Sequence, residues 1–313
     1  MENKKLISFV IPCFNEEGNV ENISNAIIKL FDNELSKYNY EILFIDNDSK
    51  DNTRNIIRTL CKNDKNIKAI FNVKNFGQFN SPYYGLLNAT GDAIVSIAAD
   101  FQEPVEVIPE FVKAWEEGYK IAIGIRKTST DNFMLRFFKK IYYNLIKKFS
   151  NVDQIKMFTG FGLYDKDFID ILRKLDDPTP FFRGMVAELG YKRKEIYFDQ
   201  GKRTKGKSSN GFYSLYDAAM LSFTSYTKIG LRIATFLGAI AFVFSLIMAI
   251  VFLILKFIYW DRYQAGMIPM LIGMLFLGSV QILFIGIIGE YVLAINQRSM
   301  KRPLVIEEER INF

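Results

Sequence analysis

The stretch AADFQEPVE, residues 98–106, groups the side chains best suited to chemistry in this chain. It follows the apolar run DAIVSI and is typical of a buried strand that opens into a loop. Carboxylate and amide groups at such a strand end suit a nucleotide that is bound through an oxygen-coordinated divalent cation. One aspartate, Asp100, stands there behind two alanines, Ala98 and Ala99.

The composition narrows the chemistry that this strand end could support. The 313 residues carry a formal charge of +6 and include no histidine, which excludes His-based triads and imidazole bases. Catalysis must therefore use carboxylates, Lys, Arg, Tyr or a metal held by oxygen. Two cysteines, Cys13 and Cys61, are too few for a disulfide framework, and the first residues lack a signal-peptide core. We expect the amino-terminal part to be cytosolic and reduced.

Residues 1–210 alternate strand and helix signals. The predicted strands are ISFVIP, EILFID, IKAIFN, DAIVSI and YKIAIGI. This alternation predicts an α/β domain with a mainly parallel sheet and helices on both faces. Ligands bind at the carboxyl ends of such strands. The polar groups expected there are Asn15 to Glu17, Asp46 to Asp51, Asp100 to Glu103, and Arg126. No GxGxxG or GxxxxGK[ST] follows the first strand, which argues against dinucleotide-binding and P-loop proteins.

Two long uncharged runs, residues 233–255 and 265–289, follow this domain. Each exceeds the roughly 20 apolar residues that cross a bilayer, so we predict a transmembrane hairpin rather than two buried helices of a soluble protein. Lys and Arg at both flanks place both ends in the cytoplasm. The predicted organisation is a cytoplasmic domain (1–210), an interfacial helix (211–230), two spans (231–293) and a cytoplasmic tail (294–313), in a multi-pass protein of the inner membrane.

Several motifs in order resemble the polyprenyl-phosphate glycosyltransferases, the family of dolichol-phosphate mannose synthase and the bacterial bactoprenol glucosyltransferases. They are VIPCFNEEGNVENI, FIDNDSKDNT, the segment from NFGQFN to IAIGIR, and FFRGMVAELGYKRKEIYFDQGKRTKGKSS before the apolar runs. The resemblance covers most of the chain. It implies an inverting GT-A fold enzyme, a nucleotide-sugar donor with UDP favoured over GDP, an undecaprenyl phosphate acceptor, Mg²⁺ or Mn²⁺, a bilayer, a homo-oligomer (a tetramer in relatives), and no nucleic acid.

The resemblance also implies roles for individual residues. The expected donor-binding residues are Pro12, Asn15, Glu17, Asp46, Asp48 and Gln102. The expected metal ligands are Asp100, Gln102 and Glu103, and the expected catalytic residues are Asp100 and Arg126. The expected acceptor and diphosphate contacts are Arg183, Arg203, Lys205, Lys207 and Ser208. For the basic loop 201–209, the alternative is contact with anionic lipid headgroups, and for Arg183 it is a surface ion pair.

The chain departs from the family pattern at several positions. Ala98 replaces the first Asp of the metal segment, and Glu103 replaces its last. Asn47 and Asp48 stand where Asp and Gly are usual, which puts the choice between uracil and guanine in doubt. At 160–162, GFG replaces an acidic residue followed by Phe and Arg; Asp165 could lean back to substitute, although a surface or capping role is the simpler expectation.

Such a site can still work without an acidic helper. A polyprenyl phosphate is largely dianionic at neutral pH, since its second pKa lies near ~6, and it needs no general base. A processive polysaccharide synthase is disfavoured because QxxRW is absent and two spans are too few for a channel. A degenerate relative that binds a nucleotide sugar or lipid, or acts as a scaffold, remains the alternative. The stretch 132–149 predicts an amphipathic helix that either lies in the interface or faces the core.

Overall fold

The computed structural model describes residues 4–127, 155–201, 220–221, 223–224, 229–258, 267–300 and 302–313. The predictions for the stretch 132–149, for Arg203, Lys205, Lys207 and Ser208, and for most of the interfacial helix concern residues outside these ranges.

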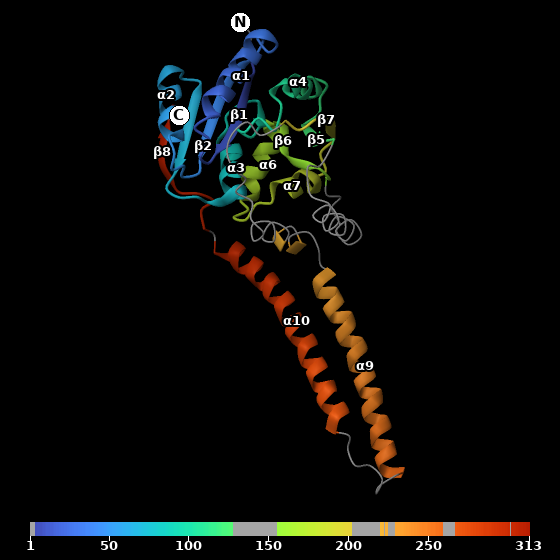
Figure 1. Cartoon of the computed structure of the whole chain (residues 1–313). Helices are drawn as coiled ribbons and strands as arrows, with labels where there is room; N and C mark the ends of the chain where they lie inside the picture. Colours follow the sequence, from blue (N-terminus) through green and yellow to red (C-terminus); the bar gives the residue numbers. More distant parts are fainter. Residues whose placement is uncertain are drawn as a thin grey trace.

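An eight-stranded sheet in the order β7-β5-β6-β4-β1-β2-β3-β8 forms the centre of the domain that lies outside the two long carboxyl-terminal helices (Figure 1). Its strands are β1 (Leu6–Cys13), β2 (Asn39–Asp46), β3 (Ile67–Asn72), β4 (Ala93–Ser96), β5 (Ile121–Arg126), β6 (Phe158–Asp165), β7 (Arg193–Phe198) and β8 (Glu307–Ile311). The pairs β1/β2, β1/β4, β2/β3 and β5/β7 are parallel, whereas β4/β6, β5/β6 and β3/β8 are antiparallel. The sheet is therefore mixed.

Helices cover both faces of the sheet because the central strands are apolar on both sides. In β1, Phe9 and Ile11 pack into one core, and Val10 between them packs into the other. The first core is closed by α1 (Val20–Asn33), α2 (Thr53–Asn63) and α4 (Ile108–Glu116), which follows the short 3-10 helix η1 (Val105–Val107). The second is closed by α3 (Gly77–Asn88), α6 (Lys166–Leu175) and α7 (Phe182–Glu188).

The five predicted strands are confirmed as β1 to β5, and the predicted helices on both faces are confirmed as well. The structure adds β6, β7 and β8, which the sequence analysis did not identify. Strand β8 lies within residues 294–313, which were predicted only as a cytoplasmic tail. Residues 307–311 form an edge strand of the sheet, antiparallel to β3.

Two long helices, α9 (Ile229–Ile258) and α10 (Met267–Ser299), contact each other and extend away from the sheet (Figure 1). Among the described residues, one stretch is long and apolar enough to cross a membrane: Phe276–Ser299 in α10, with a mean hydropathy of 1.8 and no part of its apolar window buried in the protein. The chain leaves the sheet domain before α9 and returns to it after α10 through β8.

Candidate active site at the carboxyl ends of the strands

Parallel pairing brings the predicted polar segments to one edge of the sheet. Cys13, the last residue of β1, lies opposite Asp46, the last residue of β2, and β4 runs parallel to β1 on its other side. Because β6 is antiparallel to both β4 and β5, the carboxyl end of β5 with Arg126 points to the same edge. This part of the prediction is confirmed: the carboxyl ends of β1, β2, β4 and β5 lie at one edge of the sheet.

The loops after β1 and β2 are joined by hydrogen bonds. The backbone N–H of Asn15 donates to Ser49 Oγ (2.9 Å), and Asn15 Oδ1 accepts from the N–H of Lys50 (2.8 Å). Glu17 Oε2 accepts from the N–H of Asn52 (2.9 Å). Both side chains therefore shape the loops in which they were predicted to bind the donor. Asn15 has a left-handed backbone (φ 57°), which asparagine tolerates better than most residues.

Asp46 is the most deeply buried carboxylate of this edge. Its side chain is fully buried, and its Oδ2 accepts from the N–H of Ser49 (3.1 Å) and from Nε of Arg54 (2.7 Å). Its Oδ1 has no hydrogen-bond partner among the described residues. A buried carboxylate needs a compensating cation, which Arg54 supplies. Arg54 was missed by the sequence analysis, and its place in the first turn of the helix after β2 is the signal that could have pointed to it.

The departure at Asn47 has a structural explanation. Its Nδ2 donates to Asn75 Oδ1 (2.9 Å) and to the carbonyl oxygen of Gly77 (3.2 Å). Its Oδ1 accepts from the N–H of Phe76 (2.8 Å) and from Nδ2 of Asn72 (3.2 Å). An aspartate could make only the accepting half of these bonds. Asn47 thus ties the end of β2 to the loop that leads into α3. Its neighbour Asp48, also predicted to bind the donor, has φ 68° and pairs with a lysine at the surface.

The segment after β4 holds Asp100 in a tight, strained turn. Asp100 is only 6% exposed, and its Oδ1 accepts from the N–H of Gln102 (3.2 Å). Phe101 between them has φ 59°, a conformation that is unfavourable for a bulky side chain. The N–H of Gly201 donates to the carbonyl of Gln102 (3.1 Å), and a Cβ on Gly201 would lie 2.4 Å from the Phe101 carbonyl oxygen. The turn is therefore braced by the start of the basic loop, where only glycine fits.

The side chain of Glu103 points back to Ala98, the position at which the family usually has the first aspartate of the metal segment. Its Oε2 accepts from the backbone N–H of Ala98 (2.9 Å), and its Oε1 accepts from the hydroxyl of Thr159 in β6 (2.7 Å). Burial raises the pKa of Glu103, and these two hydrogen bonds and the positive charge of Arg126 oppose that rise. Both oxygens are thus engaged within the protein, and the metal role predicted for Glu103 stays a prediction.

Arg126 completes the edge. It ends β5, and its backbone N–H donates to the carbonyl of Met157 (3.3 Å). Its Nε is buried and has no hydrogen-bond partner among the described residues. A guanidinium with an N–H that has no partner among the described residues, near the buried carboxylate of Glu103, suits a phosphate or diphosphate group.

The site fits a divalent cation only if substrate supplies ligands too. The described residues contain no group of three or more His, Cys, Asp or Glu side chains that could enclose a metal ion. Mg²⁺ and Mn²⁺ are commonly held by one or two carboxylates, with water and phosphate oxygens filling the shell. Asp100 at the strand end meets that requirement, and Gln102 follows it in the same turn.

The segment that lacks the acidic helper lies inside β6. Gly162 pairs with Ser96 and Ile123, and a Cβ there would lie 2.5 Å from the carbonyl oxygen of Ala122. Asp165 ends the same strand at the opposite edge of the sheet, where it caps α6 by accepting from the N–H of Asp167 (2.9 Å). The expected capping role of Asp165 is confirmed, and a role in the reaction is not, because its strand carries it away from the carboxyl edge.

The remaining predicted residues are placed as follows. Pro12 lies in β1 opposite Ile45, one residue before the strand ends. Arg183 is in the first turn of α7, with its guanidinium over the ring of Phe181 (5.3 Å to the centroid). Its role at the acceptor phosphate stays a prediction.

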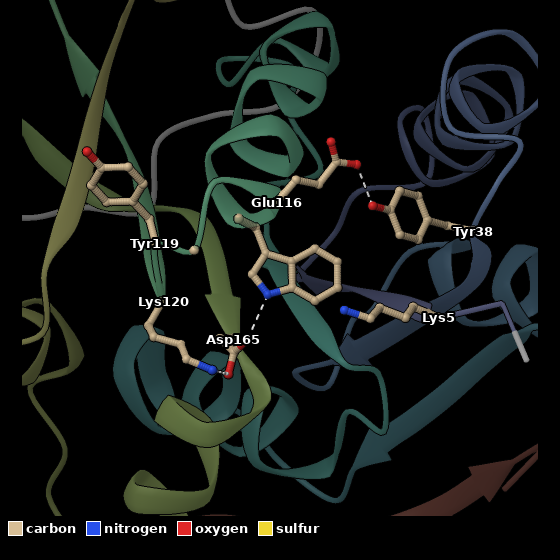
Figure 2. Close-up of a pocket in the computed structure, with 8 residues that line it drawn as sticks. Lys5, Tyr38, Glu116, Tyr119, Lys120 and Asp165 are labelled. Carbon is tan, nitrogen blue, oxygen red and sulfur yellow. Dashed lines mark hydrogen bonds and ion pairs between the residues drawn. The ribbon is translucent and has the colours of Figure 1, made fainter. Parts of the chain in front are cut away.

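A small cavity of about 200 Å³ lies at the other edge of the sheet (Figure 2). It is lined by residues that immediately precede parallel strands, among them Lys5, Tyr38 and Lys120. Its polar groups pair with one another: Tyr38 donates to Glu116 (2.5 Å), Trp115 Nε1 to Asp165 (2.7 Å), and Lys120 Nζ to Asp165 (2.9 Å). These bonds stabilise the amino-terminal edge of the sheet, and the cavity is separate from the candidate site.

Comparison with known proteins identifies the family to which this chain belongs. Residues 8–184 match glycosyl transferase family 2. An uncharacterized glycosyltransferase of Synechocystis sp. is 31% identical over 302 residues, covering 96% of this chain and 94% of that protein. A prophage bactoprenol glucosyl transferase homolog of Escherichia coli (strain K12) is 31% identical over 305 residues, covering 96% and 97%. The crystal structure of mannosyl-3-phosphoglycerate synthase from Rubrobacter xylanophilus is 16% identical, with a TM-score of 0.47 over 70% of this chain and 71% of that one. The chain belongs to glycosyl transferase family 2, and it is a glycosyltransferase with a mixed α/β, GT-A-like sheet domain.

Proposed function

We propose that this protein moves a hexosyl group from a nucleotide sugar, with UDP-sugars preferred, to a polyprenyl phosphate at the cytoplasmic leaflet of the inner membrane. The observation that carries the proposal is the convergence of Asp46, Asp100 and Arg126 at one sheet edge, in a family 2 chain with a long apolar helix. The printed name of the Escherichia coli relative, a bactoprenol glucosyl transferase homolog, supports the lipid acceptor.

The proposed reaction is a direct displacement with inversion. A phosphate oxygen of the acceptor forms a bond to the anomeric carbon, and the bond from that carbon to the diphosphate oxygen breaks with its electron pair leaving on the nucleoside diphosphate. The acceptor is already an oxyanion, so no residue has to remove a proton. In this proposal Arg126 donates to the departing diphosphate, and Asp46 and its neighbours bind the nucleoside.

The residues that would hold Mg²⁺ or Mn²⁺ are Asp100 and Gln102. Glu103 is a weaker candidate, because both of its carboxylate oxygens accept hydrogen bonds within the protein. A bound divalent cation would neutralise the charge that develops on the leaving diphosphate. The turn around Phe101 would set the position of the Asp100 carboxylate, because the backbone bonds to Gln102 and Gly201 restrain that turn.

The proposed membrane arrangement is a two-helix hairpin with both ends in the cytoplasm. Helix α10 carries the one candidate span among the described residues, and the predicted span 233–255 lies inside α9. The hairpin is supported by connectivity, since β7, which precedes α9 in the chain, and β8, which follows α10, belong to the same sheet. A homo-oligomer, expected from the resemblance, stays a prediction.

The test is transfer of labelled sugar into lipid. Purified full-length protein in lipid is incubated with undecaprenyl phosphate, Mg²⁺ or Mn²⁺, and radiolabelled UDP- or GDP-sugars in separate reactions. We expect label in the chloroform-extractable fraction, which EDTA abolishes. Nucleotide binding without any labelled lipid from any donor would replace the enzyme by the scaffold alternative.

A further inference from the structure

The strand that follows the membrane helix reaches the candidate donor site through one arginine. Arg54 contacts three elements at once: its Nε donates to Asp46 Oδ2 (2.7 Å), its Nη2 to the carbonyl of Asn72 at the end of β3 (2.6 Å), and its Nη1 to Glu308 Oε2 in β8 (2.8 Å). The Arg54 side chain is 17% exposed and the Asp46 side chain is fully buried. The same guanidinium therefore connects the buried carboxylate to the carboxyl-terminal strand.

A β-bulge explains why Glu308 can make this contact. Phe71 pairs with Glu309, but the next residue, Asn72, pairs with Glu307, so Glu308 is the extra residue. A bulge of this kind turns a side chain out of the regular alternation. As a result, neighbouring residues reach the same helix: Glu308 pairs with Arg54 and Glu309 with Arg58 (2.7 Å), both in α2.

The rest of β8 is fixed independently of this contact. Tyr84 donates to Glu307 Oε1 (2.8 Å), and the Nδ2 of Asn312 donates to the carbonyls of Cys61 (2.6 Å) and Ile67 (2.7 Å). Loss of the Glu308 carboxylate would therefore leave the strand in place while it removes one of the three contacts that hold Arg54.

We propose that Arg54 is a positioning residue for the nucleotide and that Glu308 fixes the orientation of the Arg54 guanidinium. The segment after the membrane helix then forms part of the donor site. This inference rests on the proposed donor role of Asp46. Arg54 acts through the Asp46 carboxylate: it fixes the orientation of Oδ2 and thereby of Oδ1, which has no partner among the described residues. The expected consequence is an effect on nucleotide affinity and donor KM, with little effect on kcat.

The matched variants are Glu308→Gln and Glu309→Gln. Both remove one carboxylate charge from adjacent positions of β8, and both lose an ion pair with α2, but only Glu308 is joined to Asp46 through its arginine. UDP and GDP are titrated calorimetrically into the full-length protein in lipid nanodiscs, and thermal unfolding and donor kinetics are measured on the same samples. Because Glu308 is 51% exposed, we expect a modest loss, about two- to five-fold in the Kd of the nucleotide that binds.

Two further measurements distinguish a role at the donor site from a purely structural one. Glu309→Gln should bind nucleotide as the unaltered protein does, with a similar change in Tm to that of Glu308→Gln. In an Arg54→Lys background, Glu308→Gln should add less than its own two- to five-fold effect, because lysine lacks the fork that joins the two carboxylates. Equal nucleotide Kd values for the two single variants would overturn the inference and leave the proposed function intact. Failure of the unaltered protein to bind either nucleotide would overturn both.

Discussion

Replacement of Asn47 by aspartate, the residue usual in the family, is expected to destabilise this protein. Asn47 is 7% exposed, and its Nδ2 supplies hydrogen bonds to Asn75 Oδ1 and to the Gly77 carbonyl. The new carboxylate would face both acceptors without a proton to donate. Asn75 cannot relieve this by rotating its amide, because its Oδ1 also accepts from the N–H of Gly77 (2.8 Å). The Gly77 carbonyl belongs to the backbone at the start of α3 and can only accept a hydrogen bond.

The magnitude follows from the two bonds that are lost. Asn75 and Gly77 lie at exposed positions where water can replace part of what is lost, so the net cost is about 0.5–1.5 kcal/mol for each hydrogen bond and about 1–3 kcal/mol for the two. In a domain of this size, 1 kcal/mol corresponds to about 2–4 °C in Tm, so Asn47→Asp should lower Tm by on the order of 2–12 °C. The assay is thermal unfolding of the full-length protein in detergent, followed by fluorescence.

Asp48→Gly is the matched control, since it also restores the residue usual in the family. Asp48 has φ 68°, which glycine adopts without strain, and it pairs with Lys50, whose side chain is 72% exposed. We expect a change within about 1 kcal/mol of the unaltered protein. If Asn47→Asp unfolds at the same temperature as Asp48→Gly, the reasoning about the Asn47 contacts is refuted.

Three further predictions concern the segment after β4. Asp100→Asn should lower the transfer rate by two orders of magnitude or more, about the ~3 kcal/mol that an electrostatic stabiliser supplies; unchanged turnover would remove Asp100 from the metal site. Gly201→Ala should reduce activity at least ten-fold, because the new Cβ would lie 2.4 Å from the Phe101 carbonyl oxygen. The control Gly190→Ala should keep activity, because the space around Gly190 is open even though its backbone (φ 71°) is strained for alanine. Similar losses of activity in the two variants would contradict this. Burial raises the pKa of Glu103, so the stabilisation from its neutral form is complete below the unfolded pKa of about 4.3 and is lost as pH rises through the native pKa. Glu103→Gln should remove this loss, so the Tm of the unaltered protein minus the Tm of the variant should increase as pH is lowered through the native pKa; parallel curves would contradict it.

The strands that could be predicted from the sequence are those buried on both faces. The runs around Phe9, Phe44 and Ile94 are continuously apolar because helices cover both sides, and such runs are visible without any partner. The missed strands lack that signal. Strand β6 contains Gly160 and Gly162, which weaken the pattern, and β8 is mostly charged, with the sequence EEERI. Two of its three acidic side chains, Glu308 and Glu309, are paired by Arg54 and Arg58, which lie about 250 residues earlier in the chain.

The same distinction applies to the site. The approach of the loops with Asn15, Asp46 and Asp100 could be predicted because it follows from parallel pairing alone. The orientation of Glu103 could not, because it depends on Thr159 from a strand that runs antiparallel to β4. The sequence showed that an aspartate was missing at Ala98. It did not show that the longer side chain of Glu103 returns to the Ala98 N–H and fixes that strand end from within.

The most direct test of the central claim is mass spectrometry of the lipid product. Full-length protein in vesicles that contain undecaprenyl phosphate is incubated with Mg²⁺ and an equimolar mixture of UDP- and GDP-sugars, beside the Asp100→Asn variant. We predict a new lipid whose mass equals polyprenyl phosphate plus one hexosyl group, formed by the unaltered protein and at least 100-fold less by the variant. Formation of no glycosylated lipid, or of equal amounts by both proteins, would contradict the assignment of this reaction to this site.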